Sequence, residues 1–144
     1  MTLTLATGNK RHKLKERGAD LYQTHPAAVH ALIRAEPVPL TIWEPACGPG
    51  SIVVTLRNTG RAVIASDLHD WGCKDSQSGI DFLMERAAPA GIGAIVTNPP
   101  YALAGPFVRK ARELCPLVMM LVRLAFLEST GRCDILDSGD LARV

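Results

Sequence analysis

The sequence predicts an α/β domain with a mainly parallel sheet, and two features of the chain support this. Short aliphatic or β-branched runs, typical of buried strands, alternate with segments whose apolar residues recur at helical spacing. Three of these runs stop at a polar side chain, namely Glu44, Asp67 and Asn98. Strands that alternate with helices are joined by right-handed crossovers, so neighbouring strands are expected to run parallel.

The first twenty residues are expected to form a basic arm, and residues 21–144 the folded domain. The arm shows no sustained period and carries five basic residues against two acidic ones, whereas the whole chain has a formal net charge of only +2. A basic arm of this kind can bind nucleic-acid phosphates, and a solvated tail is the alternative interpretation.

The first helix is predicted to begin at Pro26, with Thr24 as its N-cap, and to end before Pro37. The first strand follows at residues 40–43, where Leu-Thr-Ile-Trp has the composition of a buried strand, and it stops before Pro45. A short helix from Ser51 to about residue 56 is expected after the glycine-containing turn that comes next.

Three further strands are predicted from aliphatic runs and from their boundaries. Residues 62–66 form the second strand, Asp81-Phe82-Leu83 marks the end of the third, and residues 95–97 form the fourth. The fourth strand must leave the sheet at Asn98-Pro99-Pro100-Tyr101, because proline cannot donate to a sheet ladder. A helix over residues 103–114, a fifth strand over 117–122 and a short element over 124–128 complete the expected order.

The turn from Glu44 to Gly50 has the features of a ligand-binding loop. It lies between a strand and a helix, where glycines let a ligand approach the backbone. The dinucleotide pattern GxGxxG is incomplete, because Val53 stands where the third glycine would be. Asp67, at the next strand end, lies at the separation expected of an acid that binds ribose hydroxyls. The two carboxylates suit a cationic ligand that contains a free ribose.

Two motifs together resemble those of class I S-adenosylmethionine-dependent methyltransferases of the amino-methylating group. The stretch Glu44-Pro45-Ala46-Cys47-Gly48-Pro49-Gly50 is similar to the family's cofactor loop, and Asn98-Pro99-Pro100-Tyr101 is similar to its catalytic loop. The resemblance covers about residues 22–126. It implies a three-layer Rossmann-like domain with strand order 3-2-1-4-5 and S-adenosyl-L-methionine as the cofactor.

The resemblance also implies roles for individual residues. Glu44 would face the methionine ammonium, and Asp67 would bind the ribose hydroxyls. The remaining cofactor-binding residues implied are Tyr22, Thr24, Pro45, Ala46, Gly48, Gly50, Asp81 and Phe82, of which the last two would flank the adenine.

The residues of the loop at Asn98-Pro99-Pro100-Tyr101 can position an amine that is conjugated to a ring or a carbonyl for methylation. The Asn98 side-chain oxygen and the Pro99 carbonyl can each accept one N–H, which orients the nitrogen lone pair, while Tyr101 stacks on the planar group. We expect N-methylation of an adenine amine in DNA or RNA, with a duplex base flipped out of the stack. The alternatives are methylation of a protein glutamine amide and a non-catalytic domain that binds the cofactor or a partner.

The length of 144 residues suits one domain, and no apolar run is long enough to cross a membrane. The start of the chain lacks the layout of a secretion signal, which favours a cytoplasmic protein. The four cysteines show no metal-binding spacing, so no metal site is expected. The family's sheet usually has a sixth and a seventh strand, which residues 123–144 are too few to supply. The fifth strand would then be an exposed edge, which favours a homodimer unless the tail covers it.

Overall fold

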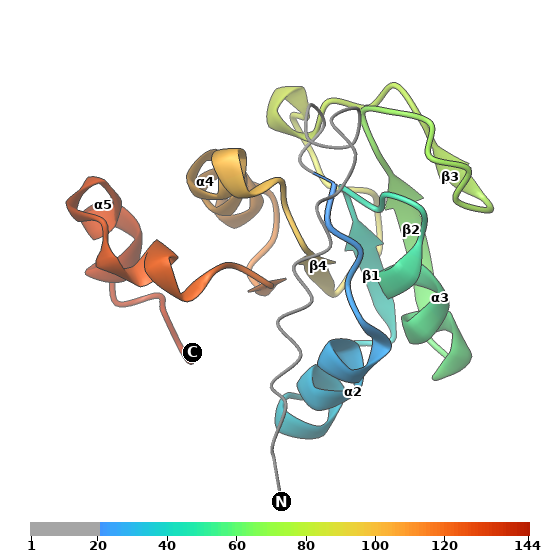
Figure 1. Cartoon of the computed structure of the whole chain (residues 1–144), viewed down its shortest axis with the longest axis horizontal. Coiled ribbons are helices and arrows are strands. Elements are labelled where there is room, and N and C mark those ends of the chain that lie inside the picture. Colours follow the sequence, from blue (N-terminus) through green and yellow to red (C-terminus); the bar gives the residue numbers. More distant parts are fainter. Residues whose placement is uncertain (1–20) are drawn as a thin grey trace, which may run out of the picture.

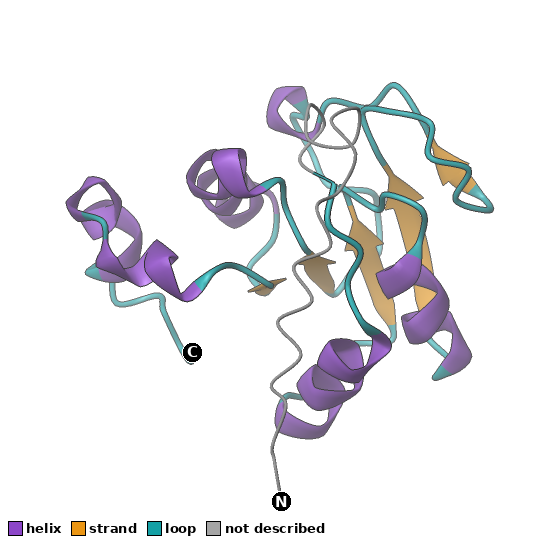
Figure 2. Ribbon diagram, in the orientation of Figure 1, coloured by secondary structure: helices purple, strands orange, loops and turns teal. Residues whose placement is uncertain are grey.

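The computed structural model describes residues 21–144, so the expectations for the basic arm lie outside the described residues. Five strands form one sheet in the order β3-β2-β1-β4-β5, and all four pairings are parallel. The strands are β1 (Thr41–Glu44), β2 (Ala62–Ser66), β3 (Ser76–Gln77), β4 (Ala94–Thr97) and β5 (Val118–Met120). The expected strand order is therefore confirmed (Figures 1 and 2).

Helices cover both faces of the sheet, which gives the three expected layers (Figure 1). The helices α2 (Pro26–Ala35) and α3 (Ser51–Asn58) pack on one face, against a core that includes Ile42 and Val96. On the other face α4 (Ala104–Leu114) packs against Trp43 and Ile95. Alternate residues of a strand point to opposite faces, so neighbours such as Ile42 and Trp43 belong to different cores.

The helix α2 has the expected bounds but a different N-cap. His25 occupies the N-cap, and its Nδ1 accepts a hydrogen bond from the backbone N–H of Ala27 at 3.1 Å. The prediction that Thr24 caps this helix is therefore wrong. The buried Thr24 hydroxyl instead accepts a hydrogen bond from the Asn98 side chain.

The third strand lies elsewhere than expected, because the predicted strand end at residues 81–83 forms a turn. The Asp81 Oδ1 accepts a hydrogen bond from the N–H of Leu83 at 3.0 Å, and the 3₁₀ helix η1 (Phe82–Met84) follows. An aspartate that bonds to a nearby backbone N–H favours a turn over an extended strand. The observed β3 is the polar pair Ser76–Gln77, which extends the sheet beside β2.

The chain after β5 folds against α4, on the side away from the rest of the domain (Figure 1). It forms the 3₁₀ helices η3 (Leu124–Glu128) and η4 (Thr130–Arg132) and the short helix α5 (Cys133–Leu136). The expected short element at 124–128 is confirmed as η3. Phe126 and Ile135 form a small core with Ala104 at the start of α4. Within residues 21–144 the sheet has no sixth strand, so β5 is an edge.

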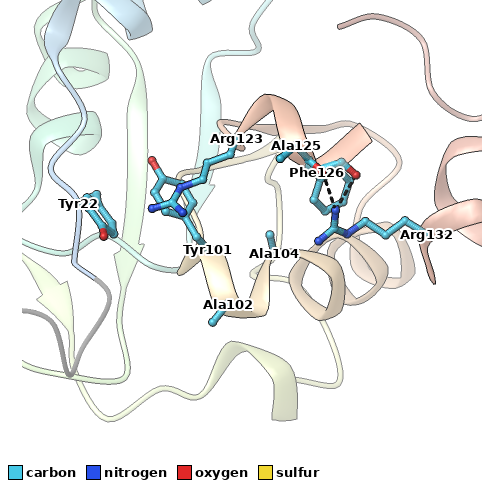
Figure 3. Close-up of a pocket in the computed structure, with 8 residues that line it drawn as sticks. All are labelled: Tyr22, Tyr101, Ala102, Ala104, Arg123, Ala125, Phe126 and Arg132. Carbon is cyan, nitrogen blue, oxygen red and sulfur yellow. Dashed lines mark hydrogen bonds between the residues drawn. The ribbon is translucent and has the colours of Figure 1, made fainter. Parts of the chain in front are cut away.

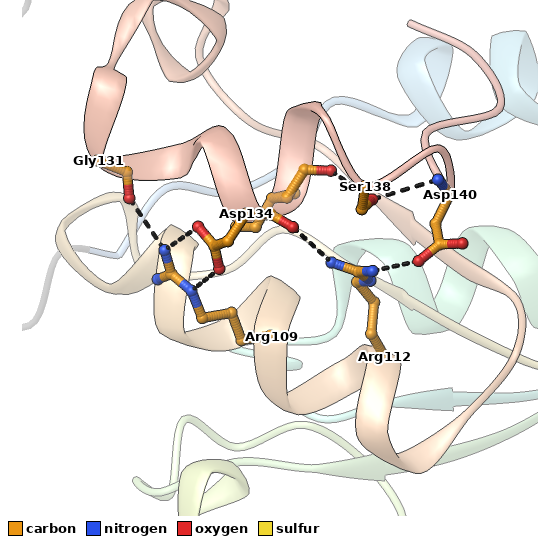
Figure 4. A network of polar contacts seen from close by, with 7 residues as sticks. Arg109, Arg112, Gly131, Asp134, Ser138 and Asp140 are labelled. Carbon is orange, nitrogen blue, oxygen red and sulfur yellow. Dashed lines mark hydrogen bonds and ion pairs between the residues drawn. The ribbon is translucent and has the colours of Figure 1, made fainter.

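Ion pairs add polar contacts between this C-terminal segment and α4 (Figure 4). Arg109 donates two hydrogen bonds to the Asp134 carboxylate, at 2.6 and 2.8 Å, and a third to the Gly131 carbonyl. The Arg109 guanidinium holds the pKa of Asp134 below its usual range through these hydrogen bonds. Arg112 forms a second ion pair, through its Nη2, with the Asp140 carboxylate. None of the helices described is long and apolar enough to span a membrane.

Candidate active site

The loops after β1 and β2 are joined by two hydrogen bonds. The backbone N–H of Cys47 donates to the Ser66 carbonyl at 3.1 Å, and that of Gly48 donates to Asp67 Oδ2 at 2.9 Å. Because β1 and β2 are parallel neighbours, both loops leave the same end of the sheet. The structure therefore brings the glycine-containing loop and Asp67 together.

Both glycines of this loop have backbone conformations that other residues rarely adopt. Gly48 has a φ of 52° and Gly50 a φ of 95°. A Cβ on Gly48 would lie 3.0 Å from Leu21 Cδ1, and one on Gly50 would lie 2.8 Å from Cys73 Sγ. The chain's own packing therefore requires both glycines, whether or not a ligand binds.

Glu44 ends β1 as a fully buried carboxyl group. Within residues 21–144, neither of its oxygens has a hydrogen-bond partner. Burial raises the pKa of Glu44 to about 8, with a smaller contribution from the charge of Asp67, and the nearby Thr97 hydroxyl and Ala46 N–H offset this only in part. Glu44 is therefore mostly neutral at pH 7. Once ionised, its two buried oxygens form an acceptor pair that fits a ligand group with several N–H donors.

Most of the hydrogen-bond acceptor sites on the Asp67 carboxylate are occupied by groups of the protein itself. Besides the bond to Gly48, its Oδ1 accepts from the N–H of His69 at 2.9 Å and from Trp71 Nε1 at 3.1 Å. A carboxylate offers about four lone-pair sites, so about one remains, on Oδ2. Asp67 therefore fixes its own loop and retains room for one further donor, such as a ribose hydroxyl.

The two residues predicted to flank the adenine differ in exposure. Asp81 is exposed and caps η1, as described above. Phe82 is only 2% exposed, and its ring packs edge-on against Trp43 with ring centroids 5.2 Å apart. It also packs against Phe107. The ring of Phe82 thus serves the core, and its contact with an adenine stays a prediction.

The loop after β4 holds Asn98 in a defined orientation. Its Nδ2 donates to the Tyr22 carbonyl at 3.0 Å and to Thr24 Oγ1 at 3.1 Å. These two acceptors determine which end of the amide is nitrogen. The Asn98 Oδ1 is consequently directed elsewhere, and it is buried without a partner in the described part of the chain. Tyr22 and Thr24, predicted as cofactor contacts, thus lie against the predicted catalytic loop.

The rest of the loop is short and rigid. Pro99 is buried, and the carbonyl of Pro100 accepts a hydrogen bond from the N–H of Leu103 at 2.9 Å. This bond starts the 3₁₀ helix η2 (Tyr101–Leu103), which leads directly into α4. The ring of Tyr101 stacks on that of Tyr22, with centroids 4.8 Å apart and planes at 30°. Two proline rings and one helical turn therefore fix the direction of Tyr101.

A pocket of about 500 Å³ opens beside Tyr101, and the sequence did not predict it (Figure 3). Its lining residues are Tyr22, Tyr101, Ala102, Ala104, Arg123, Ala125, Phe126 and Arg132. Arg123 directly follows the predicted fifth strand at residues 117–122, as Asn98 follows the fourth, so its place after a predicted strand is a usable signal. Arg132 had no such signal, because the fold of the C-terminal segment brings it to the pocket.

No protein-family model matches the sequence, and no curated protein does. Similar solved structures include TrmN from Thermus thermophilus, with a TM-score of 0.54 and 22% identity over 76% of this chain and 42% of that one. A TehB-like SAM-dependent methyltransferase from Corynebacterium glutamicum has a TM-score of 0.50 and 17% identity, over 75% of this chain and 66% of that one.

A third similar structure is a candidate methyltransferase from an antibiotic biosynthesis pathway of Anabaena variabilis. Its TM-score is 0.52 and its identity 13%, over 67% of this chain and 44% of that one. The chain thus spans less than half the length of this protein and of TrmN. These similarities, with the parallel order 3-2-1-4-5, show that the chain has the Rossmann-like fold of these methyltransferase structures.

Proposed function

We propose that this domain is an S-adenosyl-L-methionine-dependent N-methyltransferase that acts on an exocyclic adenine amine in DNA or RNA. The observation that carries this proposal is the Asn98 amide. Its nitrogen is held by Tyr22 and Thr24, and its oxygen is a buried acceptor without a partner in residues 21–144. A buried acceptor fixed in this way is suited to receive an N–H from a substrate amine.

The cofactor fits the residues at the ends of β1 and β2. The unpartnered Glu44 carboxyl would take the methionine ammonium, and the remaining lone pair of Asp67 would take a ribose hydroxyl. The segment Pro45-Ala46 and the glycines Gly48 and Gly50 would line the methionine side. A dinucleotide fits less well, because Val53, in place of the third glycine, is buried in the core of α3. When bound, the cofactor supplies an electrophilic methyl group.

The protein's own part in the reaction is to position the amine. The Asn98 Oδ1 and the Pro99 carbonyl would each accept one N–H, which draws the nitrogen toward tetrahedral geometry and directs its lone pair. Tyr101 would hold the base by stacking, and Pro99 and Pro100 keep the loop rigid. No strong base is required, because the methylated nitrogen loses its proton readily to water.

The lining of the pocket beside Tyr101 favours a nucleic-acid substrate over a glutamine amide. The pocket beside Tyr101 is lined by three aromatic rings and two arginines, which suits bases and phosphates. A glutamine side chain needs neither a cation nor several rings, so these features would have no role in that reaction.

The test is a tritiated-methyl transfer assay against DNA, RNA and a glutamine-bearing protein. We expect label in nucleic acid, and a fall of about 100-fold in kcat for Asn98→Ala, since loss of one such preorganised group typically costs this much. Asn58→Ala, an exposed asparagine at the end of α3, is the matched control and should leave the rate unchanged. Label in protein alone would favour the glutamine reaction, and no transfer with retained cofactor binding would indicate a non-catalytic domain.

A further inference from the structure

The pocket beside Tyr101 contains positive charge that the carboxylates of residues 21–144 do not neutralise. Arg123 and Arg132 both line it, and no carboxylate does. Within residues 21–144 neither guanidinium has an ion-pair partner, whereas Arg109, Arg112 and Arg143 in the same part of the chain all pair with carboxylates. The two pocket arginines are therefore available to an anionic ligand.

Aromatic rings hold both arginines in place (Figure 3). The Arg123 guanidinium lies 4.2 Å from the ring centroid of Tyr101 and 5.6 Å from that of Tyr22. The Arg132 guanidinium lies 4.3 Å from the ring centroid of Phe126, and its Nη1 donates to the Phe126 carbonyl at 2.7 Å. These contacts leave further N–H donors on each guanidinium, since an arginine carries five.

We propose that this pocket binds the nucleotide next to the methylated base, with Arg123 and Arg132 on its phosphates. The inference rests on the proposed function, because it places a second nucleotide beside the Asn98 loop. A combination of ring faces and arginines is the usual way to bind single-stranded nucleic acid, in which bases are free to stack on side chains. The volume of about 500 Å³ is within the range of small-ligand sites.

The pocket also depends on the C-terminal segment. Phe126 and Arg132 belong to η3 and η4, which pack on α4 rather than on the sheet. Arg123 leads from β5 into η3. The residues after β5 thereby gain a role in substrate binding, beside a catalytic loop that comes from β4.

The test is fluorescence anisotropy of the full chain with single-stranded DNA and RNA of about 10 nucleotides and identical sequence, a length that one small domain can cover. Arg123→Gln should weaken binding about tenfold at low salt and reduce the salt slope by about 0.7, the value for one lost phosphate contact on a single strand. Arg123→Lys should retain the slope, because the charge remains. Comparison of the two oligonucleotides identifies which nucleic acid the pocket prefers.

Arg34→Gln is the matched control, since Arg34 is an exposed arginine in the last turn of α2, away from the pocket. Arg123 is the better test position because Arg132 also holds the backbone of Ala125 and Phe126. Equal binding by the Arg123→Gln and Arg34→Gln proteins would overturn the proposal, and so would absence of nucleic-acid binding by the unaltered chain.

Titration with S-adenosylhomocysteine and the methyl-transfer assay, on the same proteins, separate this proposal from the proposed function. Oligonucleotide binding that depends on Arg123, without methyl transfer, would support the proposed nucleotide pocket and contradict the proposed methyltransferase activity. Methylation of nucleic acid, with binding that does not depend on Arg123, would support the proposed methyltransferase activity and contradict the proposed nucleotide pocket.

Discussion

Replacing Glu44 by glutamine should stabilise the ligand-free domain, and by an amount that grows with pH. The Glu44 carboxyl is fully buried and lacks hydrogen-bond partners among residues 21–144, so its ionised form is costly in the folded state. Burial raises its pKa from 4.5 to about 8. Glutamine has nearly the same shape and carries no charge at any pH.

The sign and size of this change in the free energy of unfolding follow from proton linkage. Between pH 4.5 and about 8 the folded state binds more protons at Glu44 than the unfolded state does, so the free energy of unfolding falls as pH rises. The cost of the buried Glu44 to the free energy of unfolding is close to zero below pH 4.5. It is about 3 kcal/mol at pH 7 and levels off at about 5 kcal/mol above pH 8. For a chain of this size, about 3 kcal/mol corresponds to roughly 10 °C in Tm.

The assay is urea or thermal unfolding of the ligand-free chain at a series of pH values from about 5 to 8, a range set by the linkage above. The pH dependence is the measurement that matters, because any cost of burying the glutamine amide itself is the same at every pH. Glu128→Gln, which removes one charge from an exposed position, is the control. A difference in stability between the Glu44→Gln chain and the unaltered chain that stays constant across this range would refute the reasoning.

Four further predictions concern other parts of the molecule. Thr24→Val should slow methyl transfer, because the Asn98 amide loses an acceptor that fixes its orientation, and Thr24→Ser should restore the rate. Gly48→Ala should lower the free energy of unfolding by about 1–2 kcal/mol, measured by urea titration, because a φ of 52° strains a residue with a Cβ. Arg109→Gln should speed proteolytic cleavage after β5, since Arg109 holds Asp134, and unchanged cleavage would show that the apolar contacts suffice. The outer edge of β5 carries no strand within residues 21–144, so sedimentation at several concentrations should detect a homodimer, and a monomer throughout would count against it.

The sequence predicted the strands whose residues are apolar and missed the one whose residues are not. The run Ala62–Ser66 matches β2 at both ends, because its β-branched Val63 and Ile64 favour a strand and its short length does not suit a helix. The pair Ser76–Gln77 joins the sheet through backbone hydrogen bonds alone, at an edge where few apolar side chains are required. The sequence therefore predicts the third strand at the next apolar residues, Phe82 and Leu83, where the structure has η1.

The site was predictable where it depends on a strand end and not where it depends on tertiary packing. Glu44, Asp67 and Asn98 each follow a predicted strand, and parallel strands place their carboxyl ends at one edge of the sheet. The contact between Tyr22 and Asn98 spans 76 positions in the sequence, and no local pattern reports it. Arg132 reaches the pocket only because the C-terminal segment packs on α4.

The most direct test of the account is a calorimetric titration of the full chain with S-adenosylhomocysteine and with NAD at pH 7, in buffers of different ionisation enthalpy. We expect S-adenosylhomocysteine to bind more tightly than NAD. Its binding should release close to one proton, because the ammonium favours the ionised form of Glu44, whose pKa in the free protein is about 8. Glu44→Gln should abolish the proton release and weaken binding. Tighter binding of NAD, or binding of S-adenosylhomocysteine without proton release, would contradict the account.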